Sequence, residues 1–120
     1  MSIHPPGADQ IAAEIAREIA RVHEDSYGAP ANEVEVLLKR DSVAVLMDVE
    51  LTRGELTLVE AGSKDAVIAS REAFQGAIAA TFSAIVERAT GRRVARFASR
   101  AVIDESGAWA VEAFRLAPSS

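Results

Sequence analysis

The spacing of apolar residues changes from helical to alternating along the chain, and each spacing predicts one kind of element. Near the N-terminus, apolar residues recur every three or four positions, which predicts an amphipathic helix. This stripe consists of Ile11, Ile15, Ile19 and Val22. Gly28 and Pro30 are expected to end the helix, because glycine accepts a left-handed backbone and proline cannot continue the hydrogen-bond ladder.

Strict alternation of apolar and polar residues then predicts a β-hairpin, with its turn at Asp41 and Ser42. Pairing about this turn puts Leu38 beside Val45, and one face of the hairpin is then wholly apolar. The apolar face carries Val34, Val36, Leu38, Val43, Val45, Met47 and Val49. The opposite face is acidic and carries Glu33, Glu35, Asp48 and Glu50.

Two helices are predicted after this hairpin. Thr52 and Glu55 have the spacing of a capping box, so a short helix should begin there and run to Gly62. A long helix, capped by Ser63, should follow over residues 64–90. Its apolar stripe contains Val67, Phe74, Ile78, Phe82 and Ile85.

A second hairpin is predicted from Arg93 to Leu116, with its turn through residues 104–107. One face carries Phe97, Ala101, Ile103, Phe114 and Leu116. Ser99 and Glu112 also fall on this side, and a β-bulge or a shifted turn would change their placement. The other face carries Arg96, Arg100, Trp109 and Arg115.

The order of elements, α-β-β-α-α-β-β, predicts an α+β domain in which helices pack on one face of a four-stranded antiparallel sheet. The domain is expected over residues 9–117, between a flexible leader, 1–8, and a tail, 118–120. On the uncovered face, the acidic side chains of the first hairpin are expected to form ion pairs with the arginines of the second.

Composition narrows the class of protein. The chain has 120 residues, 49% of them hydrophobic, which is enough to fold as one globular domain. The absence of cysteine excludes disulfides and thiolate chemistry and fits a cytoplasmic protein. The net charge of −5 argues against nucleic acid and anionic membranes as partners. The longest uncharged stretch, residues 73–86, is too short to span a bilayer, so no membrane insertion is expected.

Two groups of charged residues are candidate binding sites. The four acidic side chains of the first hairpin could hold a hard cation, but no loop of backbone carbonyls accompanies them, and cross-sheet ion pairing is favoured instead. The three arginines of the second hairpin, with Trp109, could bind a carboxylate, a phosphate or a protein partner. Salt bridges to the acidic hairpin are again the favoured interpretation, and no metal site is predicted.

The sequence offers few candidate catalytic residues. The phosphate-binding and nucleotide-binding glycine motifs and the nucleophile elbow are missing. His4 lies in the leader, and His23, beside Glu24 and Asp25, is expected to be solvated or to cap the first helix. We therefore expect no enzyme, no catalytic residue and no cofactor.

A homodimer is expected, because the uncovered sheet face would expose apolar groups. These are Leu37, Leu46, Val102 and Trp109. An alternative self-association surface is the small-residue ridge of the long helix, Gly76, Ala80 and Ala84, although such a helix more often packs on its own sheet.

Motifs spread over nearly the whole chain resemble the MpsC-like domain family, which is named after a component of a sodium-translocating, membrane-potential-generating system. They are Tyr27-Gly28 with Pro30, Leu51-Thr52 with Glu55, Glu60-Ala61-Gly62, Arg71 with Phe74-Gln75, Thr90-Gly91-Arg92 with Val94 and Phe97, and Val111-Glu112 with Phe114. Two places depart from the family pattern: the usual Tyr-Gly-x-Gly-Pro loop is one glycine short here, as Tyr27-Gly28-Ala29-Pro30, and Arg100 stands where the family has an aspartate.

The resemblance implies a non-enzymatic accessory or regulatory domain. Such a domain would self-associate and dock a protein partner, with a membrane transport complex as the candidate, through its uncovered sheet face. The alternatives left open are a small-molecule or anion-binding module that uses the arginines, and an enzyme whose site the sequence does not reveal.

Overall fold

The computed structural model describes residues 7–29 and 31–118, which form four helices and one four-stranded antiparallel sheet. The elements are α1 (Ala8–Tyr27), β1 (Ala31–Lys39), β2 (Ser42–Val49), α2 (Arg53–Glu60), α3 (Lys64–Ala77), α4 (Ala79–Thr90), β3 (Val94–Asp104) and β4 (Gly107–Leu116). The predicted α+β class and order of elements are confirmed, with the long helix divided into α3 and α4. Most of the predicted leader, residues 1–6, and most of the tail, residues 119–120, lie outside the described residues.

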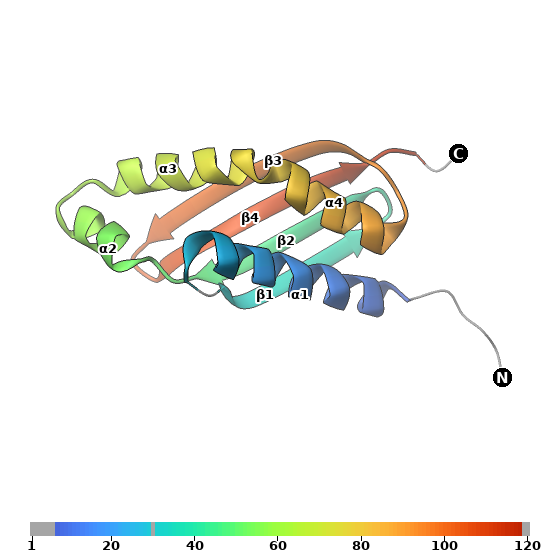
Figure 1. Ribbon diagram of the computed structural model, residues 1–120, viewed down its shortest axis with the longest axis horizontal. Coiled ribbons are helices and arrows are strands. Elements are labelled where there is room, and N and C mark those ends of the chain that lie inside the picture. Colours follow the sequence, from blue (N-terminus) through green and yellow to red (C-terminus); the bar gives the residue numbers. More distant parts are fainter. Residues whose placement is uncertain (1–6, 30, 119–120) are drawn as a thin grey trace.

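The strands lie in the order β1-β2-β4-β3, so the second strand of each hairpin is central. Figure 1 shows α1 and the α3–α4 pair in front of the same face of the sheet. Helix α1 packs on β1 and on α4, while α3 packs on β3 and on α2. In the part of the chain that the structure describes, no helix covers the opposite face (Figure 1).

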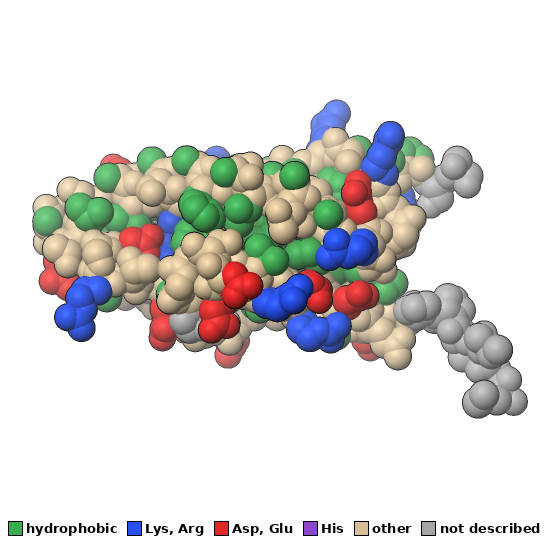
Figure 2. Space-filling view, viewed as in Figure 1, with side chains coloured by type: hydrophobic (Ala, Val, Ile, Leu, Met, Phe, Trp, Pro, Cys, Tyr) green, Lys and Arg blue, Asp and Glu red, His purple; other side chains and the backbone are tan. Residues whose placement is uncertain are grey.

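The core lies between the sheet and the helices, on the strand faces that alternation predicted. Its buried members are Ile15 and Ile19 of α1, Val43, Val45, Met47 and Val49 of β2, Phe82, Ile85 and Val86 of α4, and Ala110, Phe114 and Leu116 of β4. The rings of Phe97 and Phe114, on neighbouring strands, lie 5.1 Å apart between centroids. Figure 2 shows this helix-covered side, where apolar side chains fill the space between α1 and the α3–α4 pair.

The turn of the first hairpin lies one residue earlier than predicted. Lys39 pairs with Ser42, so the turn residues are Arg40 and Asp41, and Leu38 lies opposite Val43 rather than Val45. Every predicted cross-strand pair is therefore wrong by two positions, although each residue keeps its face.

The early turn is held by contacts with distant segments. Arg40 takes a left-handed conformation, with φ of 53°. The guanidinium of Arg92 donates to the Arg40 carbonyl at 3.1 Å, to a carboxylate oxygen of Asp41 at 2.7 Å and to the Ala117 carbonyl at 2.6 Å. These tertiary bonds stabilise a conformation that arginine alone disfavours.

The predicted long helix is interrupted at Ile78, whose backbone leaves the helical region with φ of −100° and ψ of 10°. Because of this break, α3 stays over β3 while α4 turns toward α1. Phe74, predicted to be in the apolar stripe, is 40% exposed as a result. Gly76 and Ala80 of the small-residue ridge are also exposed.

Other predicted helix ends agree with the structure, with one exception. Gly28 and Gly91 adopt left-handed conformations after α1 and α4. Thr52 and Glu55 form both hydrogen bonds of the capping box. Ser63 precedes α3 as expected, but its side chain makes no capping hydrogen bond.

Candidate functional site

The uncovered side of the sheet, which we call the open face, presents its side chains in four rows that cross the strands in the order β1, β2, β4, β3. The first row is Glu33, Asp48, Trp109 and Val102, and the second is Glu35, Leu46, Val111 and Arg100. The third row is Leu37, Ala44, Ala113 and Ala98, and the fourth is Lys39, Ser42, Arg115 and Arg96.

Charge is separated along the strands of the open face. The three carboxylates lie in the first two rows on β1 and β2, whereas the fourth row is basic and Arg100 lies on the β3 edge. The ion pairs found among the described residues are Arg21 with Glu18, Arg71 with Glu55 and Arg92 with Asp41, and none of them joins charges of the open face. The predicted cross-sheet ion pairing is therefore wrong, because the order of the strands puts Asp48 opposite Trp109 and Ser42 opposite Arg115.

The predicted arginine group is only partly brought together. Arg96 lies directly opposite Arg115, whose guanidinium donates to the Ser42 hydroxyl at 3.1 Å. Trp109 lies on the same strand as Arg115 but six residues away, which corresponds to about 20 Å along a β-strand. Arg100 lies one row from Trp109. The structure thus separates the tryptophan from two of the three arginines.

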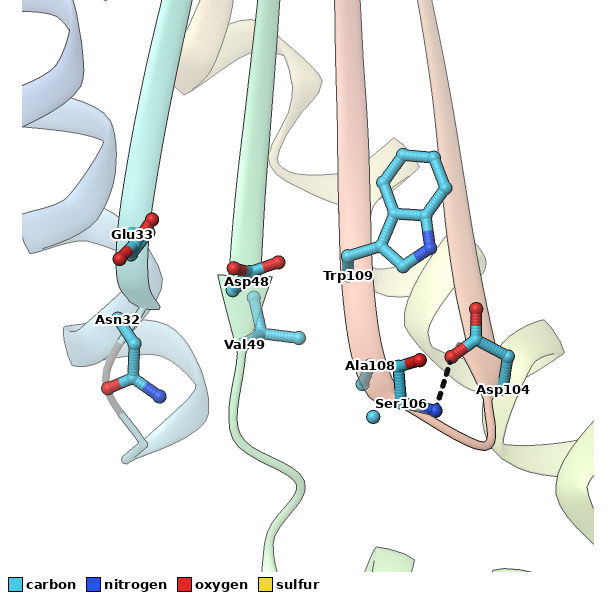
Figure 3. A pocket seen from close by; sticks show the side chains of 9 residues that line it. Asn32, Glu33, Asp48, Val49, Asp104, Ser106, Ala108 and Trp109 are labelled. Carbon is cyan, nitrogen blue, oxygen red and sulfur yellow. Dashed lines mark hydrogen bonds between the residues drawn. The ribbon is translucent and has the colours of Figure 1, made fainter.

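Trp109 instead lies beside the acidic residues, at the end of the sheet where β2 ends and β4 begins. Figure 3 shows its indole near Asp104, with Glu33 and Asp48 on the neighbouring strands. These residues line a shallow hollow of about 610 Å³. Among the described residues, no three His, Asp or Glu side chains are grouped closely enough to hold a metal ion.

Glu50, the fourth acidic residue predicted for this face, lies beyond the end of β2 in the segment before α2. Its carbonyl accepts a hydrogen bond of 3.2 Å from Arg71, which belongs to the helix-covered side. The acidic group of the open face is therefore Glu33, Glu35 and Asp48.

Apolar side chains fill the middle of the open face. Leu37 is 52% exposed. The other apolar side chains of this face that are larger than alanine are partly exposed: Leu46, Val102, Trp109 and Val111. An apolar centre with charged groups at its rim is the usual composition of a surface that binds another protein.

On the opposite side of the sheet, beneath the helices, lies a group of polar side chains that we call the polar cluster. It consists of His23 and Tyr27 of α1, Glu55 of α2, Arg71 and Gln75 of α3, Ser99 of β3 and Glu112 of β4. Only 2% of Arg71 is exposed, and its guanidinium donates two hydrogen bonds of 2.7 Å to the carboxylate of Glu55. Arg71 therefore joins α3 to α2 and, through the Glu50 carbonyl, to the segment after β2.

Tyr27 connects α1 to the same arginine. The guanidinium of Arg71 lies 4.5 Å from the centre of the Tyr27 ring, within the range of a cation–π contact. The Tyr27 hydroxyl donates to the Arg71 carbonyl at 3.4 Å, and the rings of His23 and Phe74 lie 4.5 Å and 4.8 Å from the tyrosine ring.

Glu112 is completely buried in the middle of β4, directly opposite Ser99 of β3. The Ser99 hydroxyl donates to the Gln75 side-chain carbonyl at 2.6 Å, and neither carboxylate oxygen of Glu112 has a hydrogen-bond partner among the described residues. Burial raises the pKa of Glu112 to about 7, and the neighbouring Ser99 offsets only part of that change. A protonated Glu112 suits this environment, because its hydroxyl can donate where a carboxylate would lack a donor.

Burial also lowers the pKa of His23 to about 4, and the positive charge of Arg71 adds to this effect. It raises the pKa of Tyr27 to about 12, although Arg71 acts in the opposite direction. For Glu55, burial alone would raise the pKa, but hydrogen bonds from Arg71 and Thr52 outweigh it and the pKa is lowered. Arg71 and Glu55 therefore form the charged pair of the cluster, while His23 and Glu112 are suited to their neutral forms.

The polar cluster is not among the sequence-based predictions, although the helical spacing of its residues indicated burial. His23 was expected to be solvated, but it continues the spacing of four of Ile15 and Ile19, and all three are buried. Likewise Arg71 and Gln75 continue the spacing of the buried Val67. The predicted placement of Ser99 and Glu112 on the apolar side is confirmed, because the pairing of β3 with β4 has no bulge at these residues. Five members carry the family resemblance: Tyr27, Glu55, Arg71, Gln75 and Glu112.

Comparison with known proteins gives one result. A protein-family model described as "Na+-translocating membrane potential-generating system (MpsC)" matches residues 8–114, which span all the described helices and most of the last strand. No curated protein and no solved structure matches the chain. None of the described helices combines the length and the apolar composition that crossing a bilayer requires.

Proposed function

Because the chain belongs to the MpsC family, we propose that it is a non-enzymatic accessory or regulatory domain of a Na+-translocating, membrane-potential-generating system. It acts in the cytoplasm through protein contacts: the open face serves self-association, and the protein also binds a protein partner of that membrane system.

The observation that supports this proposal is the composition of the open face. An exposed leucine and a partly exposed tryptophan share one flat surface with separated acidic and basic groups. Apolar groups arranged in this way lose contact with water only when a second protein surface covers them. The alternative, an anion-binding module, is less well supported because Trp109 lies far from Arg96 and Arg115.

A pair of matched variants tests the proposal. Leu37 on the open face is 52% exposed and Leu58 on α2 is 46% exposed, so replacing either by glutamate adds the same charge at a similarly exposed site. Sedimentation equilibrium should show a dimer for the unchanged protein and for Leu58→Glu, and a monomer for Leu37→Glu. Circular dichroism should show the same fold for all three proteins.

The link to the membrane system is tested in cells that lack this protein. With Na+ present, a potential-sensitive dye should report the membrane potential restored by the unchanged protein and by Leu58→Glu, but not by Leu37→Glu. Restoration by Leu37→Glu would show that the open face is not needed, and a lack of effect of the unchanged protein would separate the chain from membrane potential altogether.

A further inference from the structure

We propose that the open face is covered by a second copy of the chain, related by a two-fold axis that runs across the strands between the second and third rows. This inference depends on the proposed self-association and adds the identity and orientation of the occupant. Row positions, side-chain size and charge on the open face support it independently.

Packing geometry leaves two simple arrangements. Sheets that pack face to face keep their strands within about 30° of each other, so an in-plane two-fold axis runs either across or along the strands. An axis across the strands puts the first row over the fourth, the second over the third, and each strand over its own copy. An axis along the strands keeps each row in register and puts β1 over β3 and β2 over β4.

Charge favours the axis across the strands. In this arrangement Glu33 faces the partner's Lys39, and Trp109 faces the partner's Arg115 in a cation–π contact; symmetry repeats both contacts. The axis along the strands would pair Glu35 with the partner's Arg100, but it would also place Lys39 against the partner's Arg96. Like charges placed together across an interface are strongly unfavourable.

Side-chain size also favours the axis across the strands. The second row carries Leu46 and Val111 at its centre, while the third carries Ala44 and Ala113. With the axis across the strands, each large side chain meets a small one, which is how closely packed layers interdigitate. With the axis along the strands, Leu46 would meet the partner's Val111 and leave the alanines facing each other across a gap.

Association through the sheet edge is less suitable for this chain. On the β3 edge, the backbone N–H of Ala101 already donates to the Glu72 carboxylate at 3.0 Å. A strand added there would have to displace the Glu72 side chain, and an edge whose donor is already bound in this way resists pairing. The open face, by contrast, spans about 19 Å across its strands and about 20 Å between its outer rows. These dimensions correspond to a planar area of about 380 Å², roughly half of the ~800 Å² per partner of a standard interface, so the expected dimer is weak.

Charge reversal tests the orientation. Glu33→Lys and Lys39→Glu should each raise the dissociation constant of the dimer about tenfold or more, because each faces the partner with a like charge twice. The double variant should regain most of the affinity, since the pair is restored with its charges exchanged. Asp65→Lys at the start of α3, remote from the open face, makes the same change of net charge as Glu33→Lys and should leave the dissociation constant unchanged.

Cross-linking provides a second readout. The chain has no cysteine, so introduced thiols are the only ones that react. A chain with Glu33→Cys and Lys39→Cys should be joined into a dimer by a short bismaleimide, because these positions on one strand are about 20 Å apart within a single copy. A chain with Lys39→Cys and Arg96→Cys should not be joined.

The results distinguish the inference from the proposed function. Rescue by the double reversal together with 33–39 cross-linking supports the orientation. A dimer that is disrupted by Leu37→Glu but insensitive to both charge reversals, or cross-linked between 39 and 96, overturns the orientation and leaves self-association standing. A protein that stays monomeric at high concentration overturns both.

Discussion

On its inner face the sheet buries Glu112, beside the partly buried Ser99, among polar side chains of the helices, whereas on its outer face it exposes Leu37 and leaves Trp109 partly covered. Each face thus carries a few residues of the type usually found on the other, within an otherwise apolar inner face and a partly charged outer face. The inner charges are largely satisfied within the chain, since Arg71 binds Glu55 twice and the Glu50 carbonyl once.

The outer face has no comparable internal partners, because its ion pairs are missing among the described residues and its apolar centre contacts solvent. This difference shows that polar residues on an inner face and apolar residues on an outer face have separate uses in one small domain. Inside, they hold three helices and two strands in place. Outside, they favour an additional chain.

The largest expected effect is on the free energy of unfolding, which should respond differently to an arginine beneath the helices and an arginine of the open face. Arg71→Met should destabilise the domain by about 3 kcal/mol, because it leaves the Glu55 carboxylate partly buried without its cation. Arg115→Met on the open face should change the free energy of unfolding by less than about 0.5 kcal/mol. Urea unfolding of the monomeric Leu37→Glu background measures both without the contribution of association.

Adding Glu55→Gln to Arg71→Met should recover part of the loss, since the unpaired charge is then removed. Equal effects of the two arginine substitutions would contradict the distinction between the faces.

The next effect concerns Glu112 and pH. Its pKa is 4.5 in an unfolded chain and about 7 in the fold, so the folded state binds more protons between these values and stability falls as pH rises. A pKa difference of this size corresponds to about 3 kcal/mol. Glu112→Gln should therefore stabilise the domain by about this amount at pH 8 and hardly at all at pH 4. Glu14→Gln at an exposed position of α1 is the control and should have little effect at either pH.

His23 produces the opposite slope. Its lowered pKa means that the unfolded chain binds more protons between about 4 and 6.5, so stability rises with pH over that range. In the unchanged protein the two slopes largely cancel between pH 4.5 and 6.5. In Glu112→Gln the His23 slope alone remains, and thermal unfolding at several pH values should show stability rising with pH. The same profile in both proteins would mean that Glu112 is ionised in the fold.

The smallest effect is spectroscopic. Trp109 is the only tryptophan and lies on the open face, so its fluorescence reports on the covering of that face. As the protein concentration rises, the emission should move to shorter wavelengths as the indole leaves water. Leu37→Glu should keep the monomer spectrum throughout. An emission maximum independent of concentration in a dimeric protein would place the interface elsewhere.

Much of the open face could be predicted, because a period of two residues determines on which side of a strand each side chain lies. Alternation alone put Glu33, Glu35 and Asp48 on one side of the first hairpin. Their neighbours could not be predicted, since the pairing of β2 with β4 depends on contacts between distant segments. The register of β1 with β2 could not be predicted for the same reason. The left-handed conformation of Arg40 is supported by Arg92, more than fifty residues later.

The polar cluster was harder to predict. The capping box of Thr52 and Glu55 was correct, yet nothing local shows that the same carboxylate also binds Arg71 in another helix. His23 and Arg71 continue the helical spacing of buried apolar residues, but His23 is predicted to be solvated or to cap the helix and Arg71 is not predicted to lie in the apolar stripe. When a polar residue continues an apolar stripe, it should be expected to have a polar partner on another helix or strand, as Arg71 has in this protein.

The central place of β4 has a consequence for how the protein is made. This strand follows every other described element along the chain, yet it lies between β2 and β3. Until β4 has left the ribosome and inserted, the edge of β2 that faces away from β1 has no partner strand, and the core lacks Phe114 and Leu116. We therefore expect a stalled or truncated product to be prone to aggregation and to depend on chaperones.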